Sequence, residues 1–320
     1  MTQEFTAAPR WYLVNNMDKI FEDLKALADE YAVITKDEPM NKHCTFKVGG
    51  PADYFVTAGD VESFGAMVRY ARSNNIPYLI LGNGSNVIVK DKGIRGIVFS
   101  MLNSEILSGR VLFDGIAYAG AGAKMSTLAL ECANAGYSGL EFSGGIPGSI
   151  GGGVYMNAGA YGGALGDLLY SVQILSEDGF MKEIPASECP MAYRDTRFMK
   201  TGEIILGAKF KLKEDEPQDI LARMKELNEQ RRAKQPLEYP SAGSTFKRPE
   251  GYFAGKLIED AGLKGFSVGG VEVSEKHAGF VINKGGATAS DILALIEEVQ
   301  EKVYAKFGVR LEREVRVLGE

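Results

Sequence analysis

Two spacings of apolar residues alternate along the chain, one typical of helices and one typical of strands. The helical spacing predicts helices at 18–31, 61–74, 126–135, 219–234, 253–260 and 290–307. Short apolar or alternating runs predict strands at 53–57, 78–82, 86–90, 94–100, 111–121, 170–176, 180–184, 203–213, 279–283 and 310–318. The order strand, helix, strand near the start predicts a small α/β unit, and a second unit follows from residue 111.

The last helix and the terminal strand have clear patterns of their own. Ser290 is the expected N-cap of the helix 290–307, which carries a continuous apolar stripe. In the strand 310–318, Leu311, Val315 and Val317 share one face, and the other face is charged. A charged strand face is normally solvated, so the pattern alone gives this face no function.

Composition narrows the classes of protein to which the chain can belong. Its 320 residues are 24% charged and 45% hydrophobic, which allows two or three domains with real cores. The net charge of −6 argues against a nucleic-acid partner. No stretch approaches the roughly 20 apolar residues of a membrane span, and the first residues lack the pattern of a signal peptide.

The cysteines and histidines indicate a reducing compartment and no metal. Cys44, Cys132 and Cys189 are isolated and odd in number, which favours the cytoplasm over a disulfide scaffold. His43 and His277 are the only histidines, so the chain offers no predicted metal site and no histidine-based triad.

The glycine-rich run 143–166 is the leading candidate for a cofactor site. It holds ten glycines in 24 residues and interleaves them with apolar residues, for which a linker has no use. Glycine permits positive φ and lets the backbone approach a flat or anionic group closely. The run therefore favours a cofactor bed over the alternative, a set of tight turns between buried strands.

Two shorter glycine motifs follow predicted strands. In Gly-Asn-Gly-Ser-Asn at 82–86, backbone N–H groups and a serine hydroxyl can hold a pyrophosphate, but an ordinary hairpin turn explains the motif equally well. Gly120-Ala121-Gly122 resembles a dinucleotide fingerprint, but Met125 stands at the third glycine position and no acidic residue follows at the required distance. We therefore reject a Rossmann NAD site.

Three polar motifs have ordinary explanations when each is taken alone. Arg194, between a tyrosine and an aspartate, is typical of a structural ion pair. Ser244, in the polar segment 241–249, is typical of a turn hydroxyl. Glu314 lies on the charged face of the terminal strand.

Together, these motifs resemble the UDP-N-acetylenolpyruvoylglucosamine reductase family, FAD- and NADPH-dependent enzymes of bacterial peptidoglycan precursor synthesis. The resemblance runs from about Asn41 to Gly319, which is most of the chain. Further matching motifs are Thr45-Phe46-x-x-Gly49-Gly50, Asn157-x-Gly159-Ala160-Tyr161-Gly162 and Glu259-x-Ala261-Gly262-Leu263-Lys264-Gly265.

The resemblance implies an α+β fold, with a vanillyl-alcohol-oxidase or PCMH-type FAD-binding fold of two α/β subdomains and a C-terminal α+β domain for substrate. We expect a helical lead-in at 1–30, FAD-binding subdomains at 31–102 and 103–213, a substrate domain at 214–307, and a strand at 308–320 that returns a catalytic residue to the flavin. One family subtype inserts a loop with a substrate-contacting tyrosine after the strand that ends near Leu212. Only 213–218 fill that gap here, which predicts the shorter subtype.

Catalytic roles for three residues come with the resemblance. NADPH would reduce non-covalent FAD, which then passes hydride to the vinyl carbon of the substrate. Arg194 and Glu314 would stabilise the charge that develops on the substrate carboxylate. Ser244 would donate the proton, because a positioned hydroxyl suffices for so basic an intermediate.

The binding residues are expected in the two glycine motifs and near the serine. The FAD contacts are predicted at Gly82, Asn83, Gly84, Ser85, Asn86, Gly145, Ile146, Pro147, Gly148, Ser149 and Gly152. Lys234 and Arg248 are candidates for the diphosphate of the UDP-sugar, although both can equally be solvated surface cations. We expect a monomer that binds no metal, nucleic acid or membrane.

Two other functions compete with this interpretation. An oxidase of the same fold can attach flavin through His or Cys, and His43 and Cys44 directly precede Thr45. The complete serine, arginine and glutamate set argues against it. A non-catalytic flavin or nucleotide-sugar module would bind its ligand without NADPH turnover.

Overall fold

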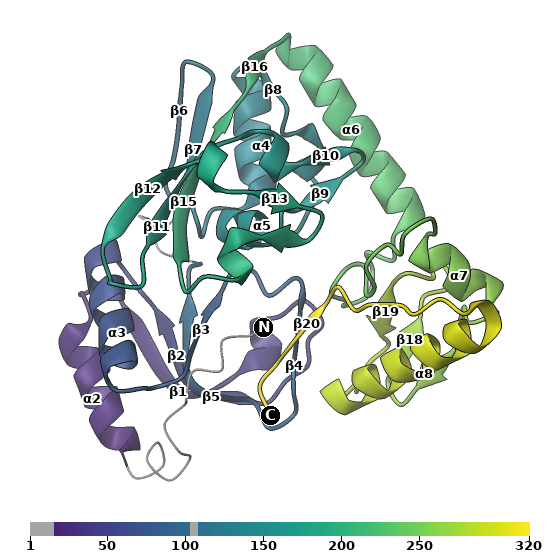
Figure 1. Cartoon of the computed structure of the whole chain (residues 1–320), viewed down its shortest axis with the longest axis horizontal. Coiled ribbons are helices and arrows are strands. Elements are labelled where there is room, and N and C mark those ends of the chain that lie inside the picture. The colour runs from purple at the N-terminus through teal and green to yellow at the C-terminus, as the bar shows by residue number, and fades with distance from the viewer. Residues whose placement is uncertain (1–15, 103–107) are drawn as a thin grey trace. The chain divides into compact units, whose positions relative to one another are not determined.

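The computed structural model describes residues 16–102 and 108–320, which form two compact units (Figure 1). The first unit contains the described residues up to Asp37, then Asp53–Asn83, and the described part of Gly96–Glu229. The second contains Glu38–Ala52, Gly84–Arg95 and Gln230–Glu320. The finer division expected at residues 30, 102, 213 and 307 stays a prediction.

A four-stranded sheet carries the start of the first unit, in the order β1-β2-β5-β3. Its strands are β1 (Val33–Pro39), β2 (Pro51–Thr57), β5 (Ile94–Ser100) and β3 (Tyr78–Leu81). The helices are α2 (Met17–Leu27) and α3 (Val61–Ser73). The expected strands 53–57, 78–82 and 94–100 and the helix 61–74 are confirmed, whereas the helix predicted to reach residue 31 ends at Leu27.

A second sheet of five antiparallel strands follows in the same unit, in the order β12-β11-β15-β7-β6. Its strands are β12 (Met181–Pro185), β11 (Leu169–Leu175), β15 (Ile204–Lys211), β7 (Ile116–Gly120) and β6 (Arg110–Phe113). The single strand expected at 111–121 was wrong. Asp114 and Gly115, with φ of 48° and 71°, turn the chain back so that it forms two paired strands.

Short elements complete the first unit. The helices of the second half are α4 (Met125–Asn134) and α5 (Ile150–Tyr155). The small paired strands are β8 (Tyr137–Ser138) with β16 (Lys213–Glu214), β9 (Gly159–Ala160) with β10 (Gly163–Ala164), and β13 (Met191–Ala192) with β14 (Asp195–Thr196). Single 3-10 turns occur at Glu141–Ser143, Leu165–Asp167, Ala186–Glu188 and Arg197–Met199, and one more, Met40–Lys42, belongs to the second unit.

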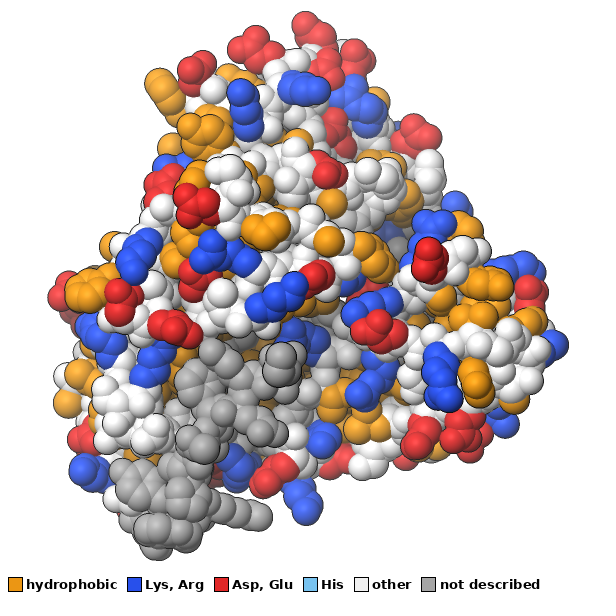
Figure 2. Space-filling view, viewed as in Figure 1, with side chains coloured by type: hydrophobic (Ala, Val, Ile, Leu, Met, Phe, Trp, Pro, Cys, Tyr) orange, Lys and Arg blue, Asp and Glu red, His pale blue; other side chains and the backbone are white. Residues whose placement is uncertain are grey.

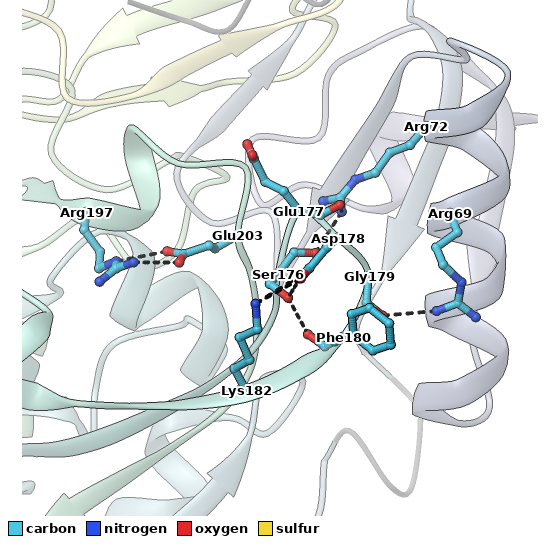
Figure 3. Close-up of polar contacts among 10 residues, drawn as sticks. All are labelled: Arg69, Arg72, Ser176, Glu177, Asp178, Gly179, Phe180, Lys182, Arg197 and Glu203. Atoms are coloured by element: carbon cyan, nitrogen blue, oxygen red, sulfur yellow. Dashed lines mark hydrogen bonds and ion pairs between the residues drawn. The ribbon is translucent and has the colours of Figure 1, made fainter.

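One arginine of α3 joins the two sheets of the first unit (Figure 3). The Arg72 guanidinium donates to the carbonyls of Ser176 at 2.9 Å, Glu177 at 2.6 Å and Gly202 at 3.0 Å. Its Nε donates to the Tyr78 hydroxyl at 2.9 Å. A planar guanidinium can satisfy several acceptors at once, so Arg72 fixes α3 against the loops at the ends of β11 and β15.

The second unit is built around a small antiparallel sheet and one long helix (Figure 1). The sheet strands are β17 (Ser267–Val268), β18 (Val271–Val273) and β19 (Val281–Asn283). The helices are α7 (Ala254–Asp260), α8 (Ala289–Phe307) and, from Gln230 onward, the end of α6 (Pro217–Lys234). Separately, β4 (Val87–Val89) pairs in parallel with β20 (Arg316–Leu318).

Two expectations about the second unit were wrong. Thr288, and not Ser290, caps α8, because its hydroxyl accepts the N–H of Asp291 at 3.0 Å and Asp291 returns a bond to the Thr288 N–H. The terminal strand covers only Arg316–Leu318. Leu311 and Val315 are buried, but Arg313 on the same alternation is exposed, so the apolar face needed for a longer strand is interrupted.

Charge is dispersed over the face that Figure 2 shows, where acidic and basic side chains are interspersed. Among the described residues, no helix combines the length and the apolar character needed to cross a membrane. The same residues contain no cluster of three or more His, Cys, Asp or Glu side chains suited to a metal ion.

Candidate active site

The glycine-rich run contains a short helix that the sequence interpretation did not foresee. Ser149 caps α5, and its hydroxyl accepts the N–H of Gly152 at 3.3 Å. Ile150 and Val154 are buried in the core of the first unit, whereas Gly152 is exposed. One side of α5 therefore packs in the core through apolar side chains, and the other side exposes glycine backbone.

Some glycines of the run are required by packing. A Cβ at Gly151 would lie 2.8 Å from the Cβ of Ala121, and one at Gly153 would lie 2.6 Å from the sulfur of Met125. These two positions let α5 pack closely on neighbouring elements and need no ligand to explain them. The tight-turn interpretation thus accounts for part of the run, and the exposed backbone around Gly152 is the part left for a cofactor.

The loop after β3 meets this run within the first unit. A Cβ at Gly82 would lie 2.4 Å from the Ser149 hydroxyl, and the Asn83 side-chain amide donates to the Pro147 carbonyl at 2.7 Å. The hairpin alternative for the loop was wrong, because β3 pairs with β5 while β4 pairs with β20. Two glycine motifs far apart in sequence therefore lie together.

The rest of this loop is fixed within the second unit. Gly84 has a φ of 60°, and a Cβ there would lie 2.0 Å from the His43 carbonyl. The Asn86 carbonyl accepts the N–H of Arg316 at 3.0 Å, and the Asn86 side-chain amide donates to the Glu314 carbonyl at 3.3 Å. A pyrophosphate is bound by the backbone N–H groups of glycines and by serine hydroxyls, and this loop contains both residue types, at Gly84 and Ser85, so these residues fit FAD.

Arg194 lies at the tip of the hairpin β13–β14. Ala192 pairs with Asp195, so Tyr193 and Arg194 form the turn, and Arg194 has a φ of 54°. Its guanidinium donates to the Asn157 carbonyl at 3.0 Å and lies 4.9 Å from the centre of the Tyr193 ring. A left-handed arginine costs energy, and such residues concentrate at functional sites.

Asn157 supports the hairpin, a role that the sequence interpretation missed. It is buried, and its side chain donates to the Ala192 carbonyl at 3.1 Å and accepts from the Gly166 N–H at 2.9 Å. Its φ is 43°, a conformation that asparagine tolerates better than most residues. In the sequence, this role was indicated only by an asparagine that precedes the glycines of the segment 157–162.

Ser244 and Glu314 are brought together by Thr245. The Thr245 carbonyl accepts the N–H of Glu314 at 2.9 Å, and the Ser244 backbone bridges to Phe280. Thr245 itself is buried, and its hydroxyl accepts the N–H of Val281 at 3.1 Å. Ser244 is exposed and Glu314 is half-buried, and the backbone bonds of Thr245 hold their two segments together. Arg194 belongs to the first unit, and this pair belongs to the second.

A neutral histidine lies behind the serine segment. The Nδ1 of His277 accepts the N–H of Gly279 at 3.1 Å, and the Gly279 carbonyl accepts the N–H of Thr245 at 2.9 Å. Burial lowers the pKa of His277 below its usual value. The imidazole is therefore a structural acceptor at neutral pH.

The two candidate diphosphate residues stand on different elements of the second unit. Lys234 is the exposed last residue of α6. Arg248 is exposed, and its guanidinium lies 3.9 Å from the centre of the Phe253 ring. Stacking on an aromatic ring orients a guanidinium without neutralising its charge.

The positions that suggested a covalent flavin are otherwise engaged. The Cys44 thiol is 2% exposed and donates to the Val48 carbonyl at 3.0 Å. The Nε2 of His43 lies 2.9 Å from a carboxylate oxygen of Glu38, and this hydrogen bond lowers the pKa of Glu38. Both contacts argue against attachment of a flavin at either residue.

Comparison with known proteins decides the family. The model of the FAD binding domain matches residues 52–184, and that of the UDP-N-acetylenolpyruvoylglucosamine reductase C-terminal domain matches residues 235–318. The reductase of Lachnoclostridium phytofermentans is 48% identical over 309 residues, covering 96% of this chain and 99% of that protein. The chain belongs to the UDP-N-acetylenolpyruvoylglucosamine reductase family.

Other members of the reductase family agree in length and fold. The reductase of Agathobacter rectalis is 49% identical over 297 residues, covering 90% of this chain and 94% of that protein. The crystal structure of the Thermus caldophilus reductase matches with a TM-score of 0.76 and 36% identity, covering 90% of this chain and 98% of that one. The expected α+β fold with an FAD-binding part is confirmed.

The shorter subtype of the reductase family is also confirmed. Strand β15 ends at Lys211 and α6 begins at Pro217. Between them lies only β16, which pairs with β8. The tyrosine-bearing loop of the other subtype has no room in this connection.

Proposed function

We propose that this chain uses NADPH and bound FAD to reduce the enolpyruvyl ether of UDP-N-acetylglucosamine enolpyruvate to the lactyl ether of UDP-N-acetylmuramate. The reaction is a step of peptidoglycan precursor synthesis. In this proposal the chain acts as a monomer in the cytoplasm, and its three free, buried cysteines agree with a reducing compartment.

The observation that carries the proposal is the pairing of Ser244 with Glu314 through the Thr245 carbonyl, at 2.9 Å from the Glu314 N–H. Ser244 and Glu314 are 70 positions apart, yet both are held by the buried residue Thr245. Neither an ordinary turn hydroxyl nor a solvated surface charge requires such an arrangement. In a member of this reductase family, an exposed serine whose neighbour Thr245 is bonded to the backbone of a glutamate suits protonation of a carbon that has just received hydride.

Bound FAD supplies the hydride acceptor and donor that links NADPH to the vinyl carbon. The protein must then stabilise the negative charge that moves onto the substrate carboxylate. We assign this to the Arg194 guanidinium, whose planar donors match a carboxylate. The left-handed turn and the Asn157 carbonyl would hold it in place.

Ser244 would deliver the proton to the carbon that bears the carboxylate. Its backbone is held by the bridge to Phe280, so only the side-chain torsion has to be set before the transfer. Glu314 would assist as the neighbouring acid. Lys234 and Arg248 would bind the diphosphate, and Phe253 would keep the Arg248 guanidinium oriented.

The first test is spectroscopic and uses the whole chain. We expect a yellow protein with one FAD that is released on denaturation, bleaches with NADPH and recovers its colour on addition of the enolpyruvyl substrate. A folded, colourless protein that takes up no FAD would contradict the proposal. Binding without NADPH turnover would indicate a non-catalytic module instead.

Ser244→Ala tests the assigned proton donor. Flavin reduction by NADPH requires no proton at the substrate carbon, so this phase should keep close to its normal rate in stopped-flow absorbance. Reoxidation by the enolpyruvyl substrate should slow by about 10²-fold or more. If the variant slows only the NADPH phase, or neither phase, Ser244 is not the donor.

A further inference from the structure

Thr45 connects the predicted cofactor loop with the serine segment inside the second unit. Its backbone N–H donates to the Gly84 carbonyl at 3.1 Å. Its hydroxyl donates to the Ser241 carbonyl at 2.6 Å, across 196 positions of sequence, and lies 3.5 Å from the Gly84 carbonyl. One residue therefore contacts both the loop that we assign to FAD and the segment that carries Ser244.

Phe46, which follows Thr45, is also joined to the serine segment, through the buried residue Asn283. The Asn283 side chain donates to the Phe46 carbonyl at 3.0 Å, and the Asn283 N–H donates to the Pro240 carbonyl at 2.9 Å. Phe46 is 1% exposed and Asn283 is 7% exposed, so water does not compete for these bonds. Residues 45–46 and 240–241 are thus joined twice.

The position of these bonds relative to Ser244 explains why they matter. Downstream, Thr245 is fixed by Gly279 and Val281. Upstream, Gly243 has a φ of 74° and its Cβ position faces open space, which leaves the backbone conformationally permissive. The Thr45 hydroxyl holds the chain on the upstream side of that glycine, at Ser241.

We propose that Thr45 is a positioning residue that couples the flavin loop to the proton-donor segment. It sets the placement of Ser244 through Ser241 and that of the cofactor loop through Gly84. This inference rests on the proposed function, because it assumes that Ser244 acts on a substrate and that the Gly84 loop contacts FAD.

Thr45→Val removes the hydroxyl donor and preserves the shape of the side chain and the backbone bond to Gly84. We expect FAD affinity within about threefold of wild type, because the cofactor loop keeps the backbone bond from Thr45 at 3.1 Å and loses only the longer contact with the hydroxyl. We expect NADPH-dependent flavin reduction to be unchanged and substrate-dependent reoxidation to slow by about ten- to a hundredfold. Thr45→Ser keeps the donor and should restore the second phase.

Thr288→Val is the matched control, because it also loses one hydrogen bond between a threonine hydroxyl and backbone in the same unit. It should leave both phases at the wild-type rate. Equal rates for Thr45→Val and wild type in both phases would overturn the proposal, as would equal losses in both phases or failure of Thr45→Ser to rescue. If Thr45→Val does not fold, Asn283→Ala must give the same split between phases, and the proposal fails otherwise.

Failure of this inference differs from failure of the proposed function. If the wild-type chain neither bleaches with NADPH nor recovers with the enolpyruvyl substrate, the function itself is wrong. If the wild-type chain performs both phases and Thr45→Val performs them equally well, only the role of Thr45 is wrong.

Discussion

The Arg194 hairpin of the first unit and the Ser244–Glu314 pair of the second unit are built in different ways. The hairpin is local, because Tyr193 and Arg194 form a two-residue turn between paired strands and Asn157 supports it from 37 positions away. The pair depends on backbone bonds between segments about 70 positions apart. A local turn places a side chain by its own conformation, whereas the pair is placed by the packing of remote segments.

Glu314→Gln should give the largest effect and tests the pair directly. The substitution keeps the backbone N–H that bonds to Thr245, so FAD content and folding should be nearly unchanged. Loss of the acid should lower turnover by about 10²–10³-fold. An unchanged turnover number in steady-state assays would mean that Glu314 is a solvated charge.

Arg72→Met tests the support of the first unit, away from the hairpin. It keeps most of the apolar stem but removes donors to three carbonyls, so the free energy of unfolding should fall by about 2–4 kcal/mol. Arg69→Met is the matched control on the same helix, because Arg69 makes one such bond, to Gly179 at 3.2 Å (Figure 3). Denaturant titration should show a loss of about 1 kcal/mol for the control. Equal losses for the two variants would contradict the role of Arg72 in fixing α3 against the loops at the ends of β11 and β15.

Arg194→Lys tests whether the local turn or the chemistry of the guanidinium matters more. Lysine can adopt the same turn at similar cost but offers one mobile point charge in place of two parallel donors. Turnover should fall by about ten- to a hundredfold while stability is maintained. Activity near that of wild type would remove the bidentate role and leave only a requirement for positive charge.

The smallest effect should come from His277, behind the serine segment. Because burial lowers its pKa in the folded state, the unfolded chain takes up a proton first as the pH falls below the ordinary histidine value. Its contribution to stability is therefore present above that value and is lost as the pH drops through the lowered pKa. One proton contributes at most about 1.4 kcal/mol per pH unit.

His277→Gln removes this titration, so its unfolding free energy should depend less steeply on pH between 7 and 5.5 than that of the wild type. Denaturant titrations of both proteins across this range provide the comparison. Identical slopes would mean that His277 titrates normally in the folded chain.

The sequence predicted the buried elements well because their own patterns specify them. The strand 94–100 agrees with β5 at both ends, and the helix 290–307 differs from α8 by one residue. Strand β5 is almost entirely buried, and α8 carries a regular apolar stripe that faces a core. β1 was missed because none of its residues is fully buried, so its sequence has no apolar alternation typical of a strand. It is a strand because it hydrogen-bonds to β2.

The candidate site divides in the same way. Residue types and their order were sufficient to name Arg194, Ser244 and Glu314 and the two glycine motifs. They were not sufficient to foresee the supporting roles of Asn157 and Thr45, because a side chain that bonds to a backbone carbonyl has no characteristic neighbour in sequence. Its partner is selected by the fold, 35 positions away for Asn157 and 196 for Thr45.

The sequence by itself therefore determined the family, the core elements and the residue types available for chemistry. The tertiary structure decided that the glycine-rich run contains a capped helix and that the terminal strand is short. It also decided that Thr245 anchors Glu314 beside Ser244. Apolar burial is encoded within each segment, whereas each backbone hydrogen bond between distant segments depends on a partner that only the folded chain supplies.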